Sequence, residues 1–287
     1  MKRAIRAPAV AGSFYEAEPA RLRQTVDRFL SGRPGPQRPA GSWRALLLPH
    51  AGHVYSGGIA GAGVAAVAWP KKAILLGPNH HGVGAAAALS PASAWRTPLG
   101  DVPVDAALAA DLLALGPAIE EDEAAHRHEH SLEVIVPFLQ AAAPSLSITC
   151  VSIGEPDLDL CLAVGDAVAG AVQRAEGRGE SVAIVVSSDL NHYLPRAQNR
   201  AKDDRALLAL AGGDPPEFFA RVLTRERISM CGVLPATALL RALSVLGAGR
   251  AEIVAQGDSG DAFGDISRVV GYASVLWSSA RSESAAE

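Results

Sequence analysis

Continuous runs of apolar residues alternate along the chain with longer stretches in which apolar residues recur every three or four positions. A short continuous run is typical of a strand buried on both faces, whereas the longer recurrence is typical of a helix with one buried face. The runs predict strands at 46–48, 73–76 and 182–186, and we expect further strands at 84–89, 147–153, 252–255 and 267–276. The periodic stretches predict helices at 18–30, 105–115, 158–175, 197–211, 215–223 and 235–246, and one that begins at Ser131.

Strands, loops and helices follow one another in a repeating order, which favours an α/β fold with a central mixed sheet and helices on both of its faces. The chain has 287 residues, a length that suits one large domain or two small ones. Its proline- and glycine-rich segment 31–41 runs directly into a buried strand, so we interpret it as a surface linker within a single domain that spans 1–287. Residues 278–287 are expected to form a disordered tail.

Several apolar runs end on side chains that can bind a metal or move a proton. The runs and the side chains that follow them are 46–48 with His50, 73–76 with His80, 182–186 with Asp189 and His192, and the short run 228–230 with Cys231. In open α/β sheets, ligands bind at the carboxyl ends of the strands, where the loops aim side chains into a common crevice. We therefore expect these five side chains to lie near one another.

His50, His80 and Cys231 are the candidate metal ligands. Imidazole binds iron, copper, zinc or nickel, and a thiolate favours zinc, copper or iron over magnesium or calcium. The alternative for each histidine taken alone is a polar residue that closes a turn. The sequence contains neither CxxC nor HExxH, so a site formed by these residues would be assembled from distant loops, as catalytic sites usually are.

His192 and Asp189 are the candidate catalytic pair. A neutral imidazole whose pKa lies near the working pH suits the removal of a substrate proton beside a metal, and Asp189 would serve as its carboxylate. The alternative for Asp189 is a residue that caps a helix or a turn.

Other polar and small residues have simpler interpretations. The acidic segment 119–130 contains His126, His128 and His130 and is expected to be an exposed loop, with His130 close to the start of a helix. Cys150 and Cys161 fall in a predicted strand and helix and suit the core. The run GGIAGAG at 57–63 lacks the spacing of a phosphate-binding loop, and we expect a helix of small residues that packs closely on the sheet.

Composition excludes some classes of protein. The net charge is -4 and the 26 basic residues form no long run, so a nucleic-acid-binding protein is not expected. Three cysteines, an odd number, do not form a disulfide framework and suit a reducing cytosol. No signal peptide and no charge-free span of membrane length is evident, so we expect a cytoplasmic protein that does not enter the membrane.

Motifs along nearly the whole chain resemble those of the Memo family, whose bacterial members are called AmmeMemoRadiSam system protein B. In chain order these motifs are PAVAGSFY, LLPHAG, LLGPNHHG, WRTPLGDVPVD, EHSLEV with VPFLQ, VVSSDLNHY, MCG and SRVVGYAS. The resemblance implies a single α/β domain similar in fold to the class III extradiol dioxygenases.

The resemblance also implies a mononuclear iron or copper ion held by His50 of PHAG, His80 of GPNHH and Cys231 of MCG. The dioxygenases use a carboxylate where this sequence has Cys231, and their base matches His192, with Asp189 nearby. The sequence departs from the family at His53, where a tyrosine is usual. His53 would either add a metal ligand or make, with its own ring, the hydrogen bond that the tyrosine ring would otherwise make. A second departure is the run VLPA that follows MCG.

Three functions are compatible with these residues. The first is a metal-dependent oxidoreductase that acts on a small substrate. The second is a non-catalytic protein that binds a metal or a peptide and acts with radical-SAM and AMMECR-type partners, which the resemblance implies for the bacterial members. The third is a zinc hydrolase, in which the metal lowers the pKa of a bound water to about 7.

Overall fold

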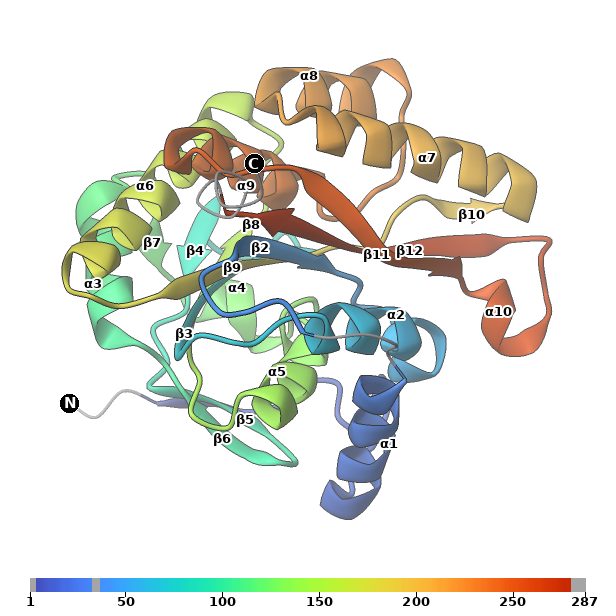
Figure 1. Cartoon of the computed structure of the whole chain (residues 1–287), viewed down its shortest axis with the longest axis horizontal. Helices are drawn as coiled ribbons and strands as arrows, with labels where there is room; N and C mark the ends of the chain where they lie inside the picture. The colour runs from blue at the N-terminus through green and yellow to red at the C-terminus, as the bar shows by residue number, and fades with distance from the viewer. Residues whose placement is uncertain (1–3, 33–36, 280–287) are drawn as a thin grey trace.

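The computed structural model of the protein describes residues 4–32 and 37–279 (Figure 1). Its centre is a mixed sheet in which four neighbouring strands run parallel to one another. In spatial order they are β2 (Trp43–Leu48), β9 (Val182–Ser187), β3 (Lys72–Pro78) and β8 (Ser147–Ile153). All four were predicted, and β2, β9 and β3 were predicted from continuous apolar runs, because strands covered on both faces have no polar side to break the run.

Antiparallel strands flank the parallel ones. On one side β12 (Val269–Ser278) pairs with β2, and β11 (Ala251–Asp258) and β10 (His192–Leu194) pair with β12. On the other side β4 (Ala87–Leu89) pairs with β8, and β7 (Glu120–Glu121) pairs with β4. A separate small sheet contains β1 (Ile5–Arg6), β5 (Ala94–Thr97) and β6 (Gly100–Pro103). Strands β1, β5, β6, β7 and β10 were not predicted, because two to four residues are too few to show a period.

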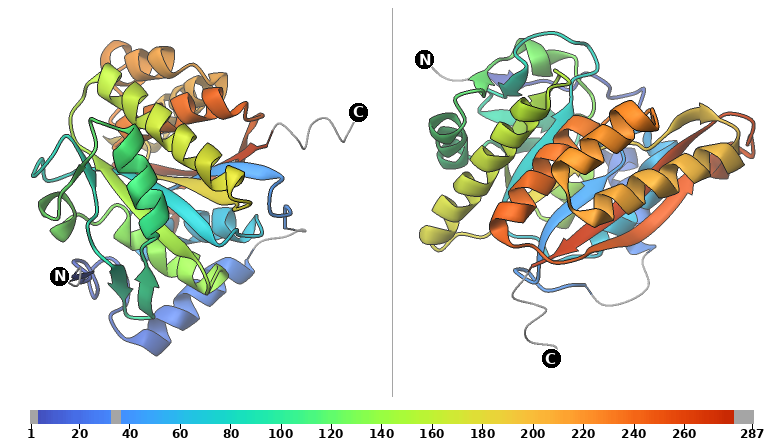
Figure 2. Two further views of the ribbon diagram at one scale, coloured as in Figure 1. Left: turned by 90° about the vertical axis from the view of Figure 1, so that its left-hand side faces the viewer. Right: turned by 90° about the horizontal axis from the view of Figure 1, so that it is seen from above.

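Helices cover both faces of the sheet, which confirms the predicted α/β architecture (Figures 1 and 2). Leu46 and Leu48 point to one face and Leu47 to the other, so successive residues of β2 contribute to different cores. The first face carries α1 (Pro19–Ser31), α2 (His53–Ala65) and α5 (Val136–Ala142). The second carries α3 (Ala106–Leu115), α6 (Leu158–Gly177), α7 (Arg196–Gly212), α8 (Pro215–Phe219) and α9 (Val233–Leu246). Two short helices are α4 (Ala124–Arg127) and α10 (Gly260–Phe263), a 3-10 turn at Glu133–Ile135 precedes α5, and a π-helical segment, Ala220–Arg225, follows α8.

The short apolar run before Cys231 is not a strand. Ile228 and Met230 are buried, but their backbone pairs with no strand, and the Ile228 N–H donates to the Val222 carbonyl. Arg227, at φ 46°, turns the chain into this segment. The run is apolar because it packs into the core, and burial alone does not distinguish a strand from a buried loop.

The acidic segment 119–130 is not the exposed loop that its composition predicted. His126 and Glu129 are buried, because the Arg6 guanidinium donates hydrogen bonds to both of their carbonyls. His126 Nε2 donates to the Ala88 carbonyl at 2.9 Å, and burial lowers the pKa of His126 to about 4. His128 is exposed as expected. The sequence could not reveal this burial, because the partner that covers the segment lies about 120 residues earlier in the chain.

The predicted linker and tail lie partly outside the described residues. Within 31–41, Ser31 and Gly32 end α1, residues 33–36 are not described, and Arg38 pairs with Val67 in an isolated bridge. Of the tail, residues 280–287 are not described and Ser278 ends β12. Over 4–32 and 37–279, no helix combines the length and the apolar character needed to cross a bilayer.

Candidate metal centre

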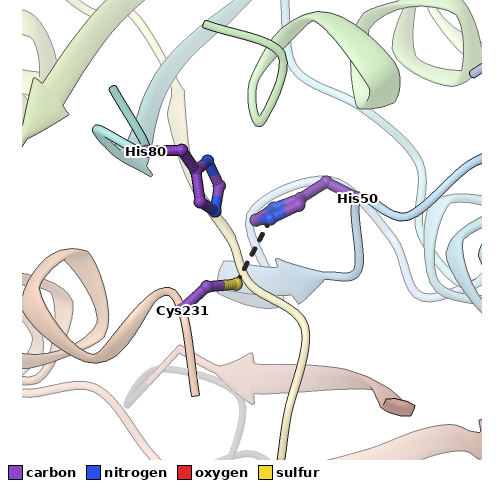
Figure 3. A group of neighbouring side chains, drawn as sticks. All are labelled: His50, His80 and Cys231. Carbon is purple, nitrogen blue, oxygen red and sulfur yellow. Dashed lines mark hydrogen bonds between the residues drawn. The ribbon is translucent and has the colours of Figure 1, made fainter. Parts of the chain in front are cut away.

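Three of the predicted site residues meet at the carboxyl edge of the parallel strands. His50 follows the end of β2 and His80 the end of β3, while Cys231 lies two residues ahead of α9. Figure 3 shows both rings and the sulfur pointing toward one another. His50 Nε2 lies 3.2 Å from Cys231 Sγ, and one potential ligand atom from each of the three residues lies within 4.8 Å of the others. The strand-end pattern therefore located the cluster correctly, even though the run before Cys231 is a loop.

The hydrogen bonds of His50 determine which of its nitrogens carries the proton. The Ser187 hydroxyl donates to the Ser131 carbonyl at 2.6 Å, so its oxygen accepts from His50 Nδ1 at 2.8 Å. His50 Nε2 is then left with its lone pair directed at Cys231. Burial, with a smaller contribution from His80, holds the pKa of His50 well below its usual value. The ring is thus neutral and in the tautomer that binds a metal through Nε2.

Glu129 fixes His80 in the same way. Its carboxylate accepts from His80 Nδ1 at 2.9 Å and from the backbone N–H groups of His80, His130 and Ser131 at 2.6–2.9 Å. Burial by itself would raise the pKa of Glu129, but these hydrogen bonds and the His80 ring hold it well below its usual range. Because Nδ1 of His80 carries the proton that Glu129 accepts, the Nε2 lone pair is free to bind a metal. This arrangement is common in metal-binding histidines.

Glu129 and Ser187 are site residues that the sequence reasoning missed. Glu129 lies in a segment that we predicted to be exposed, and serine is not a usual ligand of iron, copper or zinc. The available signal was position, since Glu129 directly precedes His130 in EHSLEV and Ser187 begins the SSD of VVSSDLNHY.

Replacing Glu129 by glutamine should weaken metal binding about 10–100-fold, the usual loss when the partner of a ligating histidine is changed. The amide keeps the size of the side chain but removes the charge that orients His80 through its Nδ1. Competition with a chromophoric chelator would measure the affinity. Glu123→Gln, an exposed acid in the same segment, is the matched control. Equal affinities for the two variants would contradict the role of Glu129.

Cys231 is held by the loop that follows β9. Its Sγ accepts the Asp189 N–H at 3.1 Å, and a Cβ on the adjacent Gly232 would come within 2.3 Å of Ser188 Cβ. Only glycine therefore lets the two loops approach this closely. Burial raises the pKa of the Cys231 thiol above its usual range, and Asp189 adds to the effect. A metal ion would have to displace the thiol proton on binding.

Asp189 anchors the backbone of the His50 loop. Its Oδ1 accepts the N–H groups of His50 at 2.8 Å and Ala51 at 3.2 Å. Burial raises the pKa of Asp189 to about 6, although these two hydrogen bonds act in the opposite direction. These bonds match the alternative interpretation, in which Asp189 caps a turn. Its carboxylate forms no hydrogen bond or ion pair with the His192 ring, whose Nδ1 donates to Ser229 instead.

His192 has a defined tautomer and a free nitrogen. Its Nδ1 donates to the Ser229 carbonyl at 2.7 Å, which leaves the Nε2 lone pair available. Burial lowers the pKa of His192 below its usual value, so the ring is neutral near pH 7. The Asn191 side-chain oxygen accepts from the amide and the hydroxyl of Ser229, and the Asn191 N–H donates to Asp203. A buried polar network thus fixes the orientation of His192.

Asp203 in this network predicts a pH-dependent effect on stability. Burial raises its pKa from 3.8 to about 7, so the folded chain keeps a proton that the unfolded chain loses near pH 4. Asp203 therefore makes folding less favourable as the pH rises from about 4 to about 7. Because asparagine acquires no charge, Asp203→Asn should gain stability relative to the wild type over that range. Urea unfolding of both proteins near pH 4.5 and pH 7.5 measures their free energies of unfolding. The same difference between the two proteins at both pH values would contradict the prediction.

The remaining histidines occupy different positions. His130 stacks on His80 with ring centroids 4.6 Å apart, and His80, Glu129 and His130 form a second group with potential ligand atoms within 4.8 Å. His53 is buried away from the site, where its Nε2 donates to the Val134 carbonyl at 2.9 Å. The interpretation of His53 as an added ligand is therefore wrong, and a ring hydrogen bond is what it makes. His81 is exposed and donates through Nε2 to the His128 carbonyl.

A cavity of about 740 Å³ opens beside the cluster. His50, His80, His130, Asp189 and His192 line it, together with several aromatic residues. Two imidazoles and one thiol form a donor set that suits iron, copper or zinc, so these residues fit the metal that the family resemblance implies. The cavity is large enough for a small organic molecule next to these donors.

The fold and the site define the class: a mixed α/β protein with a candidate mononuclear centre of two histidines and one cysteine at the carboxyl edge of its sheet. The family model described as Memo-like protein matches residues 6–276, and the chain belongs to the Memo family.

Relatives with curated names are similar along nearly the whole chain. A MEMO1 family protein of Methanopyrus kandleri is 35% identical, covering 95% of this chain and 98% of its own. A MEMO1 family protein of Methanococcoides burtonii is 38% identical over 95% and 99%, and that of Aquifex aeolicus is 34% identical over 95% and 99%. Among solved structures, an uncharacterized protein from Escherichia coli K12 is similar with a TM-score of 0.54 and 18% identity, covering 82% of this chain and 99% of that one. That similarity concerns the fold alone.

Proposed function

We propose that this protein is a metal-dependent oxidoreductase that binds one iron or copper ion through His50, His80 and Cys231 and acts on a small substrate. The observation that carries the proposal is the convergence of Cys231 with two histidines whose Nδ1 hydrogen bonds leave Nε2 free, beside a cavity of about 740 Å³. When bound, the ion would supply redox chemistry and open coordination positions for substrate and oxygen.

The chain itself would supply a base. His192 lines the cavity, is neutral near pH 7, and has Nε2 free because Nδ1 donates to Ser229. A substrate hydroxyl that reaches hydrogen-bonding distance of Nε2 would give its proton to that atom. Asp189 would keep the His50 loop in place through its two backbone hydrogen bonds. The cavity would orient the substrate between His192 and the two ligating histidines.

Two other functions use the same donors. A non-catalytic protein would hold the metal or a peptide in the cavity and act with radical-SAM and AMMECR-type partners. A zinc hydrolase would use zinc in place of iron or copper, since two histidines and one cysteine also bind catalytic zinc. The three functions differ in the native metal and in whether a substrate turns over.

The test is metal analysis of protein isolated without air, followed by oxygen-uptake assays with catechols for the wild type and His192→Gln. We expect close to one iron or copper per chain in both proteins, and oxygen uptake that depends on His192. Zinc alone, with metal-dependent ester or amide cleavage, would replace the proposal by the hydrolase. Bound metal without turnover, combined with capture of the two partner proteins in a pull-down, would favour the binding function.

A further inference from the structure

The mouth of the cavity beside the candidate metal centre is lined by exposed aromatic rings. Tyr193, Phe263 and Tyr55 expose 62%, 67% and 44% of their surface, and all three line the cavity. The Tyr55 and Phe263 rings meet edge to face with centroids 5.4 Å apart. Large rings that are left in contact with water around one opening are typical of a surface that binds another molecule.

The backbone at Tyr193 is irregular, and its side chain lines the cavity. The pairing of β10 with β12 shifts register between His192 and Leu194, and Tyr193 lies in this irregularity at φ 64°. A left-handed conformation is unfavourable for a residue with a side chain, and such strain is concentrated at functional sites. In a regular strand, neighbouring side chains point to opposite faces, yet both His192 and Tyr193 line this cavity.

Arg268 lies beside Tyr193 and forms no ion pair. It directly precedes β12, and its guanidinium carbon lies 5.5 Å from the centroid of the Tyr193 ring. Across the described ranges, no carboxylate lies within ion-pair distance of Arg268, whereas the nearby Arg196 contacts both Asp258 and Asp261. Asp265 also lines the cavity, and its Oδ1 accepts hydrogen bonds from the amide and the hydroxyl of Ser267. Arg268 is therefore a positive charge with unused donors at the opening.

We propose that Arg268 and Tyr193 form a subsite for the carboxylate of a small aromatic acid. Its ring would lie among the aromatic residues of the mouth, and its other end would reach His192 and the candidate metal centre. A planar guanidinium pairs with a carboxylate through two parallel hydrogen bonds. A phosphate fits less well, because phosphate sites usually gather several basic residues, and this cavity offers one arginine together with Asp189 and Asp265. This substrate class rests on the proposed function.

The test compares two probes that differ by one carboxylate, 3,4-dihydroxybenzoate and catechol, in calorimetric titrations of the metal-loaded protein without air. The wild type should bind the acid about tenfold more tightly than catechol, which corresponds to about 1.4 kcal/mol. Arg268→Gln should bring the two affinities to within about twofold of each other and leave the catechol affinity unchanged. Arg200→Gln, which removes an exposed arginine of α7, is the matched control and should keep the preference.

Two further titrations separate the subsite from general charge effects. Tyr193→Asn removes the ring that supports Arg268 but tolerates the left-handed backbone, and it should reduce the preference several-fold. The cationic probe 3,4-dihydroxybenzylamine should bind less tightly than catechol. Tighter binding of this cation, or an unchanged preference for the acid in Arg268→Gln, would overturn the proposal.

The subsite and the proposed function fail in different ways. Metal content is measured on the same preparations, and Arg268→Gln should keep the wild-type amount. If the wild type binds no iron or copper but still prefers the acid through Arg268, the oxidoreductase proposal fails and the subsite stands. If the metal is bound and the acid preference is absent from the wild type, the subsite proposal fails alone.

Discussion

Cys231→Ala and His80→Ala should each lose more than about 100-fold in metal affinity, so that protein isolated without air retains almost no metal. Removing a ligand costs more than removing the hydrogen-bond partner of a ligand, which alone costs about 10–100-fold. Each variant leaves only two of the three donors in the group. His50 Nε2 and Cys231 Sγ lie 3.2 Å apart and His80 completes the group, while Asp189 is occupied by the backbone of the His50 loop.

Matched variants separate a ligand effect from damage to the fold. Cys161→Ala removes a buried sulfur of α6, and His81→Ala removes the exposed histidine adjacent to His80. Both should keep the wild-type metal content, measured by elemental mass spectrometry, and all four variants should keep the circular dichroism spectrum of the wild type. If Cys231→Ala and Cys161→Ala bound metal equally well, the candidate centre would have to be abandoned.

Glu133→Ala should destabilise the folded chain by about 3–5 kcal/mol, because it leaves the buried Arg6 guanidinium without its partner. Glu133 also accepts hydrogen bonds from the Tyr15 hydroxyl at 2.5 Å and from the N–H groups of Ala9 and Val10 at 2.8 and 3.0 Å. Its carboxylate thus joins the first residues of the described chain to the segment that precedes α5. The Arg6 guanidinium and the Tyr15 hydroxyl would remain buried without this acceptor.

Urea unfolding followed by circular dichroism measures the loss. The control is Glu252→Ala, which breaks the exposed ion pair with Arg38 and should cost less than about 1 kcal/mol. A loss for Glu133→Ala no larger than that of the control would contradict the importance of the buried pair. Glu133→Ala should also weaken metal binding, because Arg6 donates to the carbonyl of Glu129, whose carboxylate holds His80.

The position of the candidate centre could be predicted because it follows from a general property of parallel sheets. The strands before His50 and His80 are apolar on both faces, and parallel neighbours end at the same edge. Cys231 was associated with them through an apolar run that is in fact a buried loop. Its placement depends instead on Gly232, which lets the loop before α9 approach Ser188.

The hydrogen bonds that tune the site could not be predicted. Glu129 lies in a segment of acids and histidines whose composition indicates exposure, and its burial depends on Arg6, which lies 123 residues earlier in the chain. The positive φ of Tyr193 has no local signal either, because tyrosine is a common strand residue and the register shift arises from pairing with β12.

The sequence by itself determined the alternation of buried strands with helices and the side chains that follow the strand ends, because both depend on local patterns of apolar residues. Tertiary structure decided which nitrogen of His50 and of His80 is free, which acids are buried, and that Tyr193 and Arg268 share the mouth of the cavity. These properties depend on contacts between residues far apart in the chain, and the periodicity of a single segment carries no information about them.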